Sequence, residues 1–383
     1  MLIYFSVAGF LSIKEPVEMY FIPSDHARIK NTRYESNFIF TDKYKVMKSA
    51  VIFGGNASGK TNILTAMQRL QQIVMNDLNL QNLSKEQLAN FNYGSRNIVF
   101  KINVYSDKTN SEYEYSLEYS REKVIAESLK CNNTVVFDFK KDKLTINVNN
   151  QQKENLEKLF SVEATETLLR KLSDFLVEEI KDFKDLVKDL RISINDCVPS
   201  IRRTHIFLVH DRDKQYWNER KKKIVALLQL LDRTIVDFTF KPLGQKENEL
   251  VLKRRQCKFI YHLGIESTGI KKLITYLQDF LDTFEHGKTL VMDELDSSIS
   301  TKTLLELFNS FINTGQNKGQ VIVTSHNIFL LNSQMFHPQQ LFLVDKNAAM
   351  STEVSSVGDF DLRSEKRKLY DDYIKGKLGG ING

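Results

Sequence analysis

The hydrophobic and polar positions of this chain follow two different periods. Between residues 97 and 149, apolar and polar side chains alternate along short runs that are separated by turn residues. This is the pattern of half-buried antiparallel strands. Residues 1–24 hold two shorter apolar runs around Gly9, and a polar stretch follows over 24–36. We therefore expect an antiparallel meander in the first region, and a hairpin followed by a loop at the amino terminus.

A short apolar run, a glycine-rich turn and an amphipathic stretch follow one another after residue 48. The apolar run covers residues 49–53, and residues 60–75 carry apolar side chains at the three- and four-residue spacing of one helix face. The pattern predicts a strand, a glycine loop and a helix in that order.

The second half of the chain changes character twice. Residues 150–232 have helical periodicity in long charged stretches, most clearly over 163–190. From Ile235 onward, strand-like runs alternate with helical stretches, which indicates a parallel sheet. The predicted fold class is α/β, with a mixed or parallel core sheet, an antiparallel β lobe and a helical insertion. The predicted segments are a first lobe (1–149), a mostly helical insertion (150–234) and the remaining core (235–383).

The composition is that of an ordinary globular protein. Apolar residues make up 42% of the chain and charged residues 27%, which excludes the disordered and collagen-like classes. No run of about eighteen apolar residues occurs, so we expect no membrane-spanning segment. The first ten residues lack the basic region of a signal peptide, which predicts a cytoplasmic protein. The formal net charge of +6 permits contact with nucleic acid without requiring it.

The glycine-rich turn fits the phosphate-loop pattern G-x-x-x-x-G-K-[ST] from Gly54 to Thr61. Backbone N–H groups in such a loop point at phosphates, which requires glycine where a Cβ would block the turn or the ligand. The following helix directs its positive end at the same anion. Lys60 supplies an ammonium group and Thr61 a hydroxyl for Mg²⁺, so we predict that the loop binds ATP with Mg²⁺. The expected nucleotide contacts are Gly54, Gly55, Asn56, Ala57, Ser58, Gly59, Lys60, Thr61 and Asn62.

Two later strands end in groups that complete such a site. Residues 289–292 are an apolar run followed by Asp293 and Glu294. Mg²⁺ prefers hard oxygen ligands, so Asp293 is predicted to hold the metal opposite Thr61. Glu294 is predicted to be the catalytic base that orients and deprotonates the attacking water. His326 follows a second apolar run and can reach the γ-phosphate, so it joins Glu294 and Lys60 among the predicted catalytic residues.

This ordered set of motifs resembles the ABC/SMC superfamily of ATPases. It has a Walker A motif at Gly54–Thr61, a Walker B motif at 290–294, a D-loop at 295–298 and a switch histidine at His326. In that family a signature sequence from the opposite subunit touches the γ-phosphate of ATP. The corresponding residues here are 263–273, and the resemblance implies contacts from Ser267 and Gly269.

The signature departs from the Leu-Ser-Gly-Gly-Gln of transporters and SMC proteins. Its Glu-Ser-Thr-Gly-Ile sequence resembles the overcoming-lysogenization-defect type and its stand-alone ATPase relatives, and so does the carboxyl-terminal stretch 373–381. Those relatives include AriA of the PARIS system and the ATPases of abortive-infection and Septu-type pairs. The resemblance implies a homodimer or higher homo-oligomer with ATP at the subunit interface. It also implies a role in anti-phage defence as the sensor or scaffold that controls a separately encoded nuclease or toxin.

Two other functions stay open at this point. One is a DNA-maintenance ATPase of the SMC or recombination type, for which 163–190 offers only a short coiled coil. The other is a module that assembles with ATP but does not hydrolyse it. Basic clusters would offer a surface for DNA or an acidic partner if they converged. These clusters are 202–203, 220–223, 253–255 and 271–272.

Overall fold

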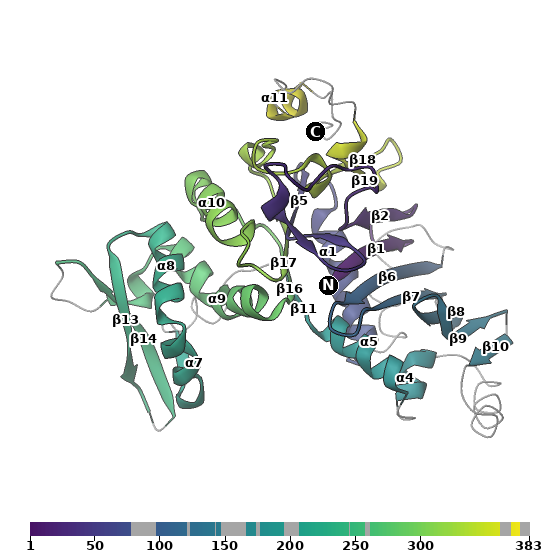
Figure 1. Cartoon of the computed structure of the whole chain (residues 1–383), viewed down its shortest axis with the longest axis horizontal. Helices are drawn as coiled ribbons and strands as arrows, with labels where there is room; N and C mark the ends of the chain where they lie inside the picture. The colour runs from purple at the N-terminus through teal and green to yellow at the C-terminus, as the bar shows by residue number, and fades with distance from the viewer. Residues whose placement is uncertain are drawn as a thin grey trace.

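The fold is taken from a computed structural model, which describes most of the chain. The described residues are 1–77, 97–120, 123–141, 143–146, 166–173, 177–194, 207–244, 246–256, 261–360 and 369–375. Figure 1 shows a central sheet, a second large sheet on one side of it, and an arm that projects on the other side.

The central sheet has six strands in the order β11-β16-β17-β5-β18-β19. All neighbours are parallel except β18 and β19, which pair antiparallel. The strands are β5 (Ser49–Gly54), β11 (Leu190–Ser193), β16 (Thr289–Met292), β17 (Gln320–Ser325), β18 (Leu341–Lys346) and β19 (Thr352–Ser356). The predicted mixed α/β core is confirmed.

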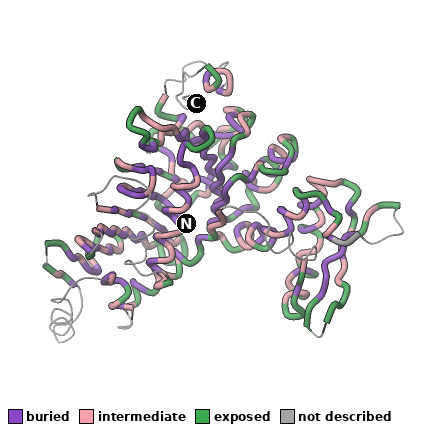
Figure 2. The backbone as a smooth tube through the Cα atoms, turned by 180° about the vertical axis from the view of Figure 1, so that it is seen from behind, coloured by how far each residue is buried: buried purple, intermediate pink, exposed green. Residues whose placement is uncertain are grey.

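Both faces of the central sheet are covered, which is why its strands are continuous apolar runs. In β5, Ala50 and Ile52 pack into one hydrophobic core, whereas Val51 and Phe53 pack into the other. Side chains of helices α1 (Lys60–Val74) and α5 (Glu178–Lys188) enter the first core. Those of α9 (Thr268–His286) and α10 (Thr301–Leu307) enter the second. Figure 2 shows the buried backbone concentrated in these central strands.

The second sheet has seven antiparallel strands in the order β10-β9-β8-β7-β6-β1-β2. It unites the predicted amino-terminal hairpin with the predicted meander, because β1 pairs with β6. The strands are β1 (Leu2–Ala8), β2 (Val17–Tyr20), β6 (Ile98–Ser106), β7 (Ser111–Tyr119), β8 (Val124–Cys131), β9 (Thr134–Lys140) and β10 (Lys143–Ile146). Helix α1 contributes to the core that this sheet shares with the central one.

The arm corrects one prediction. The three strands that follow Thr234 are not part of a parallel sheet but form an antiparallel one, in which β13 and β15 both pair with β14. The physical reason is that only four residues separate Pro242 from Glu247, whereas a parallel crossover needs a dozen or more. The arm consists of β12 (Leu208–His210), α7 (Lys214–Glu219), α8 (Lys221–Leu231), β13 (Ile235–Pro242), β14 (Glu247–Arg254) and β15 (Tyr261–His262).

The predicted helical insertion is also more mixed than its periodicity indicated. Its described part includes α4 (Leu168–Leu172) and α5, but also β11 at the edge of the central sheet and β12 in the arm. β11 is only four residues long, and its pairing with β16 is what makes it a strand. Parts of the 163–190 stretch lie outside the described residues. The division into domains stays a prediction.

Short elements complete the fold. β3 (Phe38–Phe40) and β4 (Lys45–Met47) form a separate ladder, and α11 (Leu369–Ile374) is the last described helix. The 3₁₀ turns are η1 (Glu35–Asn37), η3 (Asp211–Asp213), η4 (Leu263–Ile265), η6 (Ile328–Leu330), η7 (Pro338–Gln340) and η8 (Val357–Asp359), and η5 (Phe308–Ile312) is a π turn.

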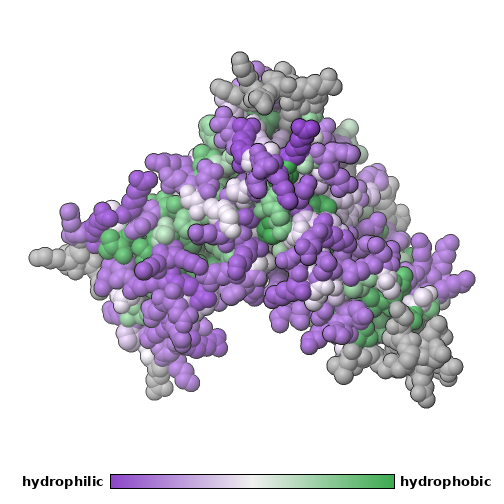
Figure 3. Space-filling view, in the orientation of Figure 1, coloured by the Kyte–Doolittle hydropathy of each residue, from purple (hydrophilic) through white to green (hydrophobic). Residues whose placement is uncertain are grey.

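The surface seen in Figure 3 is mostly hydrophilic, with smaller hydrophobic areas over the arm and the central part. Of the helices in the described part of the chain, none combines the length and apolarity needed to cross a bilayer.

Candidate functional site

The predicted motifs meet at the carboxyl edge of the central sheet. β5 ends at Gly54, β16 is followed by Asp293, and β17 is followed by His326. These three strands are parallel and adjacent in the order β16-β17-β5. Carboxyl ends of parallel strands share one edge of a sheet, which is where α/β folds bind ligands. Groups up to about 270 positions apart in sequence are therefore neighbours in space.

A cavity of about 270 Å³ lies at this edge. Nearly all of its lining comes from the sequence predictions, and Lys346 is the one addition. The lining residues are Asn56, Ala57, Ser58, Gly59, Lys60, Thr61, Asn62, Glu294, His326 and Lys346.

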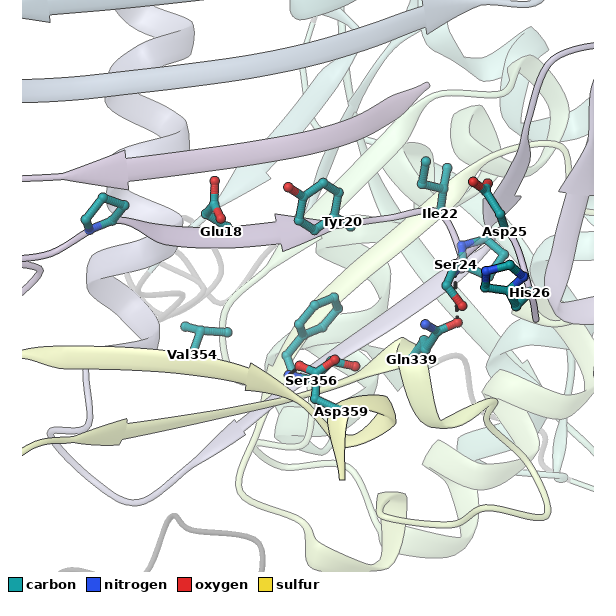
Figure 4. A pocket seen from close by; sticks show the side chains of 13 residues that line it. Glu18, Tyr20, Ile22, Ser24, Asp25, His26, Gln339, Val354, Ser356 and Asp359 are labelled. Carbon is teal, nitrogen blue, oxygen red and sulfur yellow. Dashed lines mark hydrogen bonds between the residues drawn. The ribbon is translucent and has the colours of Figure 1, made fainter. Parts of the chain in front are cut away.

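A larger cavity, of about 670 Å³, lies elsewhere, between β2 and β19 (Figure 4). Its lining includes Tyr20, Phe342 and Asp359, and the Ser24 N–H donates to Gln339 Oε1 at its rim (3.2 Å). It contains none of the predicted site residues, so the smaller cavity is the candidate site.

The phosphate loop wraps around the side chain of Lys60. The ammonium nitrogen donates to the carbonyl oxygens of Gly54 and Gly55, each at 2.8 Å. Burial lowers the pKa of Lys60, and the nearby carboxylates, Asp293 first among them, oppose that shift. The site thus holds a buried cation close to a carboxylate pair.

Two glycines of the loop have no room for a side chain. A Cβ at Gly54 would lie 2.4 Å from the carbonyl oxygen of Val344, and a Cβ at Gly59 would lie 2.1 Å from Thr352 Oγ1. Gly59 also has φ 112°, a left-handed conformation that favours glycine. In the described part of the chain, the Ser58 hydroxyl is buried and has no hydrogen-bond partner. A tight loop with a buried and unpaired polar group fits an anion ligand.

Asp293 is held by hydroxyl groups from two neighbouring elements. Thr61 Oγ1 donates to its Oδ2 at 2.9 Å, and Thr324 Oγ1 donates to its Oδ1. Only 4% of Asp293 is exposed. A hydroxyl beside a carboxylate suits Mg²⁺. Among the residues that the structure describes, no three His, Cys, Asp or Glu side chains cluster around a metal position, so phosphate oxygens or water would have to supply the other ligands.

Glu294 leaves the strand and faces the cavity. Its backbone is left-handed (φ 47°), and its N–H donates to Thr324 Oγ1 at 2.7 Å. The side chain is 53% exposed, and its Oε1 lies 3.7 Å from Nε2 of His326. The His326 N–H in turn donates to Asp296 Oδ2 at 2.9 Å. The two groups predicted to act on the γ-phosphate thus lie next to each other.

The two predicted signature contacts lie apart from this cavity. The Ser267 hydroxyl caps helix α9 and accepts a hydrogen bond from the Ile270 N–H (3.3 Å). A Cβ at Gly269 would lie 2.5 Å from the carbonyl oxygen of Ser298 in the predicted D-loop. Neither residue lines the cavity, so the structure of one chain does not bring them to the site. Their assigned contacts stay predictions.

Sequence reasoning missed four residues around the site. Thr324 joins Asp293 to the Glu294 backbone, and Lys272 donates to the Glu294 carbonyl oxygen and to Ser297 Oγ. Lys346 lines the cavity, and Thr352 contacts the loop from behind. The carboxyl end of a strand was a usable signal for Thr324 and Lys346. No local signal marked Lys272 or Thr352, because their roles depend on which element packs beside them.

The basic clusters are largely engaged in ion pairs within the chain. Arg220 and Lys223 both pair with Glu285, Lys221 pairs with Asp237, and Arg254 pairs with Glu266. Residues 202–203 lie outside the described part of the chain. A nucleic-acid surface stays a prediction.

Fold and site together place the protein in the class of P-loop NTPase folds. The chain belongs to the family described as "AAA domain, putative AbiEii toxin, Type IV TA system", whose model matches residues 49–332. The matched range contains the phosphate loop, Asp293, Glu294 and His326.

Several solved structures have a similar chain path with little sequence in common. One is the SMC head bound to the C-winged helix domain of ScpA, with 12% identity, 93% of this chain and 97% of that chain covered, and a TM-score of 0.49. The SMC head domain from Thermotoga maritima is 13% identical, with 93% of this chain and 98% of that chain covered and a TM-score of 0.47. A third is the Smc head domain with an extended coiled coil, bound to the carboxyl-terminal domain of ScpA derived from Pyrococcus furiosus. It is 13% identical, with 94% of this chain and 97% of that chain covered and a TM-score of 0.46. No curated protein matches the chain.

Proposed function

We propose that this protein binds ATP with Mg²⁺ and hydrolyses it to ADP and phosphate. One observation carries the proposal: Lys60, Thr61, Asp293, Glu294 and His326 gather at one edge of the central sheet, and four of the five line one cavity. Membership of an AAA family supports it.

Each residue would have a separate task. Lys60 and the loop N–H groups would bind the phosphates, and the Thr61–Asp293 pair would hold Mg²⁺. Mg²⁺ would supply neutralisation of the phosphate charge. Glu294, half exposed at the cavity, would orient the attacking water and accept its proton. His326, beside Glu294, would donate to the γ-phosphate edge.

We also propose that two copies of the chain share each ATP. Ser267 lies at the amino end of α9 and outside the cavity, so a second chain would have to deliver it to the nucleotide. A hydroxyl at a helix amino terminus is suited to a phosphate oxygen. An isologous pair would then hold two composite sites, as expected for a homodimer or a unit of a larger homo-oligomer.

Mixing two inactive variants tests the shared site. Lys60→Met removes the loop cation and Ser267→Arg blocks the signature contact, so each variant alone is expected to be inactive. In an equal mixture, half of the randomly paired dimers are mixed, and each has one intact site of two. Turnover is therefore expected to recover to about a quarter of the wild-type value. No recovery, although mixed dimers of the two variants form with ATP, would contradict a site built from two chains.

The biological role that we propose is control of a toxic effector in anti-phage defence. The family description names a toxin and a toxin–antitoxin system, and the signature and tail resemble the stand-alone ATPases of PARIS, abortive-infection and Septu-type pairs. In this role the chain is a sensor or scaffold whose nucleotide state holds or releases a separately encoded nuclease or toxin.

Co-purification with the product of the adjacent gene tests this role. The complex is expected to form with ATP and Mg²⁺ and to dissociate at least several-fold more with ADP, since only ATP would hold the paired state. Size-exclusion chromatography of the complex in each nucleotide measures the difference. A complex that ignores both nucleotides and phage infection would count against the proposal.

A further inference from the structure

A series of hydrogen-bonded polar groups behind the phosphate loop connects three separate parts of the sequence, around residues 12, 58–62 and 352. Asn62 Nδ2 donates to Ser12 Oγ (2.6 Å), Ser12 Oγ lies 2.7 Å from Thr352 Oγ1, and Thr352 Oγ1 donates to the Ser58 carbonyl oxygen (2.9 Å). Ser12 and Thr352 are buried, so water does not compete for these bonds. The Thr352 N–H also donates to the Ser12 carbonyl oxygen at 2.8 Å, which fixes the two residues against each other.

The number of hydrogens available on these groups fixes the donor direction of each hydrogen bond in the series. A threonine hydroxyl has a single hydrogen, and that of Thr352 is used on the Ser58 carbonyl, which can only accept. Thr352 must therefore accept from Ser12, although the distance alone leaves the donor open. The amide of Asn62 has hydrogens to give, so the donations run from Asn62 through Ser12 and Thr352 to the loop. Bonds arranged head to tail in a buried site polarise and strengthen one another.

The final bond of this series orients one peptide of the loop. The described chain has no cis peptide bond, so the Ser58 carbonyl and the Gly59 N–H point in opposite directions. With its carbonyl held by Thr352, the peptide turns the Gly59 N–H away from Thr352. Ser58 and Gly59 both line the cavity, and Thr352 does not. The Gly59 N–H is thus turned toward the cavity side, where an anion would accept it.

The loop needs such support because part of it is strained. Ala57 has φ 60°, which L residues seldom adopt, and Gly59 has φ 112°. Thr352 fills the space where a Cβ of Gly59 would lie. It is also directly opposite Lys346 in the β18–β19 ladder, and Lys346 lines the cavity. One hairpin therefore supports the loop from behind and provides a cation at its front.

We propose that Thr352 is a positioning residue for nucleotide binding, and that the series Asn62–Ser12–Thr352 holds the Ser58–Gly59 peptide in its anion-binding orientation. The inference rests on the proposed ATP site. It assigns a role in that site to the β1–β2 turn and to β19, which lie 40 or more residues from the phosphate-loop motif in sequence.

The test compares two substitutions of Thr352 by titration calorimetry with ATP and Mg²⁺. Thr352→Val keeps the shape and removes the donor, and it is expected to weaken ATP binding about tenfold. Thr352→Ser keeps the donor and is expected to bind within about twofold of wild type. Turnover at saturating ATP should change by less than about threefold in both, since Glu294 and His326 are untouched.

A matched control and a second variant keep the result interpretable. Thr283 is also buried and donates to a backbone carbonyl, that of Asp279 (2.7 Å), so Thr283→Val loses the same kind of bond inside helix α9. It should bind ATP as wild type does. Ser12→Ala removes the hydrogen bond between Ser12 and Thr352 and should weaken ATP binding several-fold. This variant tests the inference if Thr352→Val does not fold.

Three results would overturn the inference. Wild-type affinity in Thr352→Val or, if that variant does not fold, in Ser12→Ala would show that the loop needs no such support. An equal loss in Thr352→Ser and Thr352→Val would show that the hydroxyl donor is not what matters. A wild-type protein that binds no ATP would overturn the proposed function itself and the inference with it, which separates the two failures.

Discussion

The Glu294→Gln variant is expected to bind ATP with near wild-type affinity and to hydrolyse it at least about a hundredfold more slowly. Glutamine fills the same space at the cavity but cannot accept a proton from the attacking water. The bond from the Glu294 N–H to Thr324 comes from the backbone, so the substitution leaves it in place. Single-turnover hydrolysis and ATP titration calorimetry measure the two quantities separately.

A surface carboxylate provides the control for this variant. Glu306 pairs with Arg233 away from the cavity, and Glu306→Gln should leave both turnover and ATP affinity at wild-type values. If Glu294→Gln hydrolysed ATP as fast as wild type, Glu294 would not be the base. Equal and very low turnover in the wild type and in Glu294→Gln, with tight ATP binding, would instead support a module that assembles with ATP without hydrolysing it.

Replacing Lys60 with methionine should weaken ATP binding by about a hundredfold, because charge-assisted hydrogen bonds to the phosphates are lost. Methionine has a similar length, and it leaves the glycines of the loop unchanged. In the present structure the ammonium group is bonded to the Gly54 and Gly55 carbonyl oxygens, so the variant also removes an internal support of the loop. Titration of the variant with ATP and Mg²⁺ gives the affinity directly.

Lys48 provides the control for this variant, because it resembles Lys60 in burial, in its hydrogen bonding and in its lowered pKa but lies elsewhere. It is buried, it donates to a backbone carbonyl, that of Thr314, and burial lowers its pKa to about 8. Lys48 directly precedes β5, at the opposite end of that strand from the phosphate loop. Lys48→Met should therefore lower stability without changing ATP affinity. Comparable losses of affinity in both variants would mean that Lys60 acts only through folding.

The sequence by itself determined the parts of the site that are built locally. The phosphate loop is a run of consecutive residues, so its glycines, its lysine and the helix that follows are fixed by short-range geometry. The same holds for strand ends, because a polar residue directly after an apolar run must appear at the edge of a sheet. This is why Asp293, Glu294 and His326 could be selected before any strand was paired.

Only the tertiary structure decided which elements stand next to one another. The prediction of a parallel sheet after Ile235 holds for β16, β17 and β18, but it was wrong for β13 and β14, which a short connection makes a hairpin. β11 is only four residues long, too short to stand out from the charged stretch around it, and its pairing with the parallel edge of β16 makes it a strand.

Thr324 belongs to the site because β17 pairs with β5, and Thr352 because it packs against the loop at Ser58, and both contacts span more than 200 positions of the chain. Such contacts leave no periodic trace in the sequence. Hydrophobic pattern determines which face of a strand is buried, whereas strand order and register determine which side chain its neighbour presents.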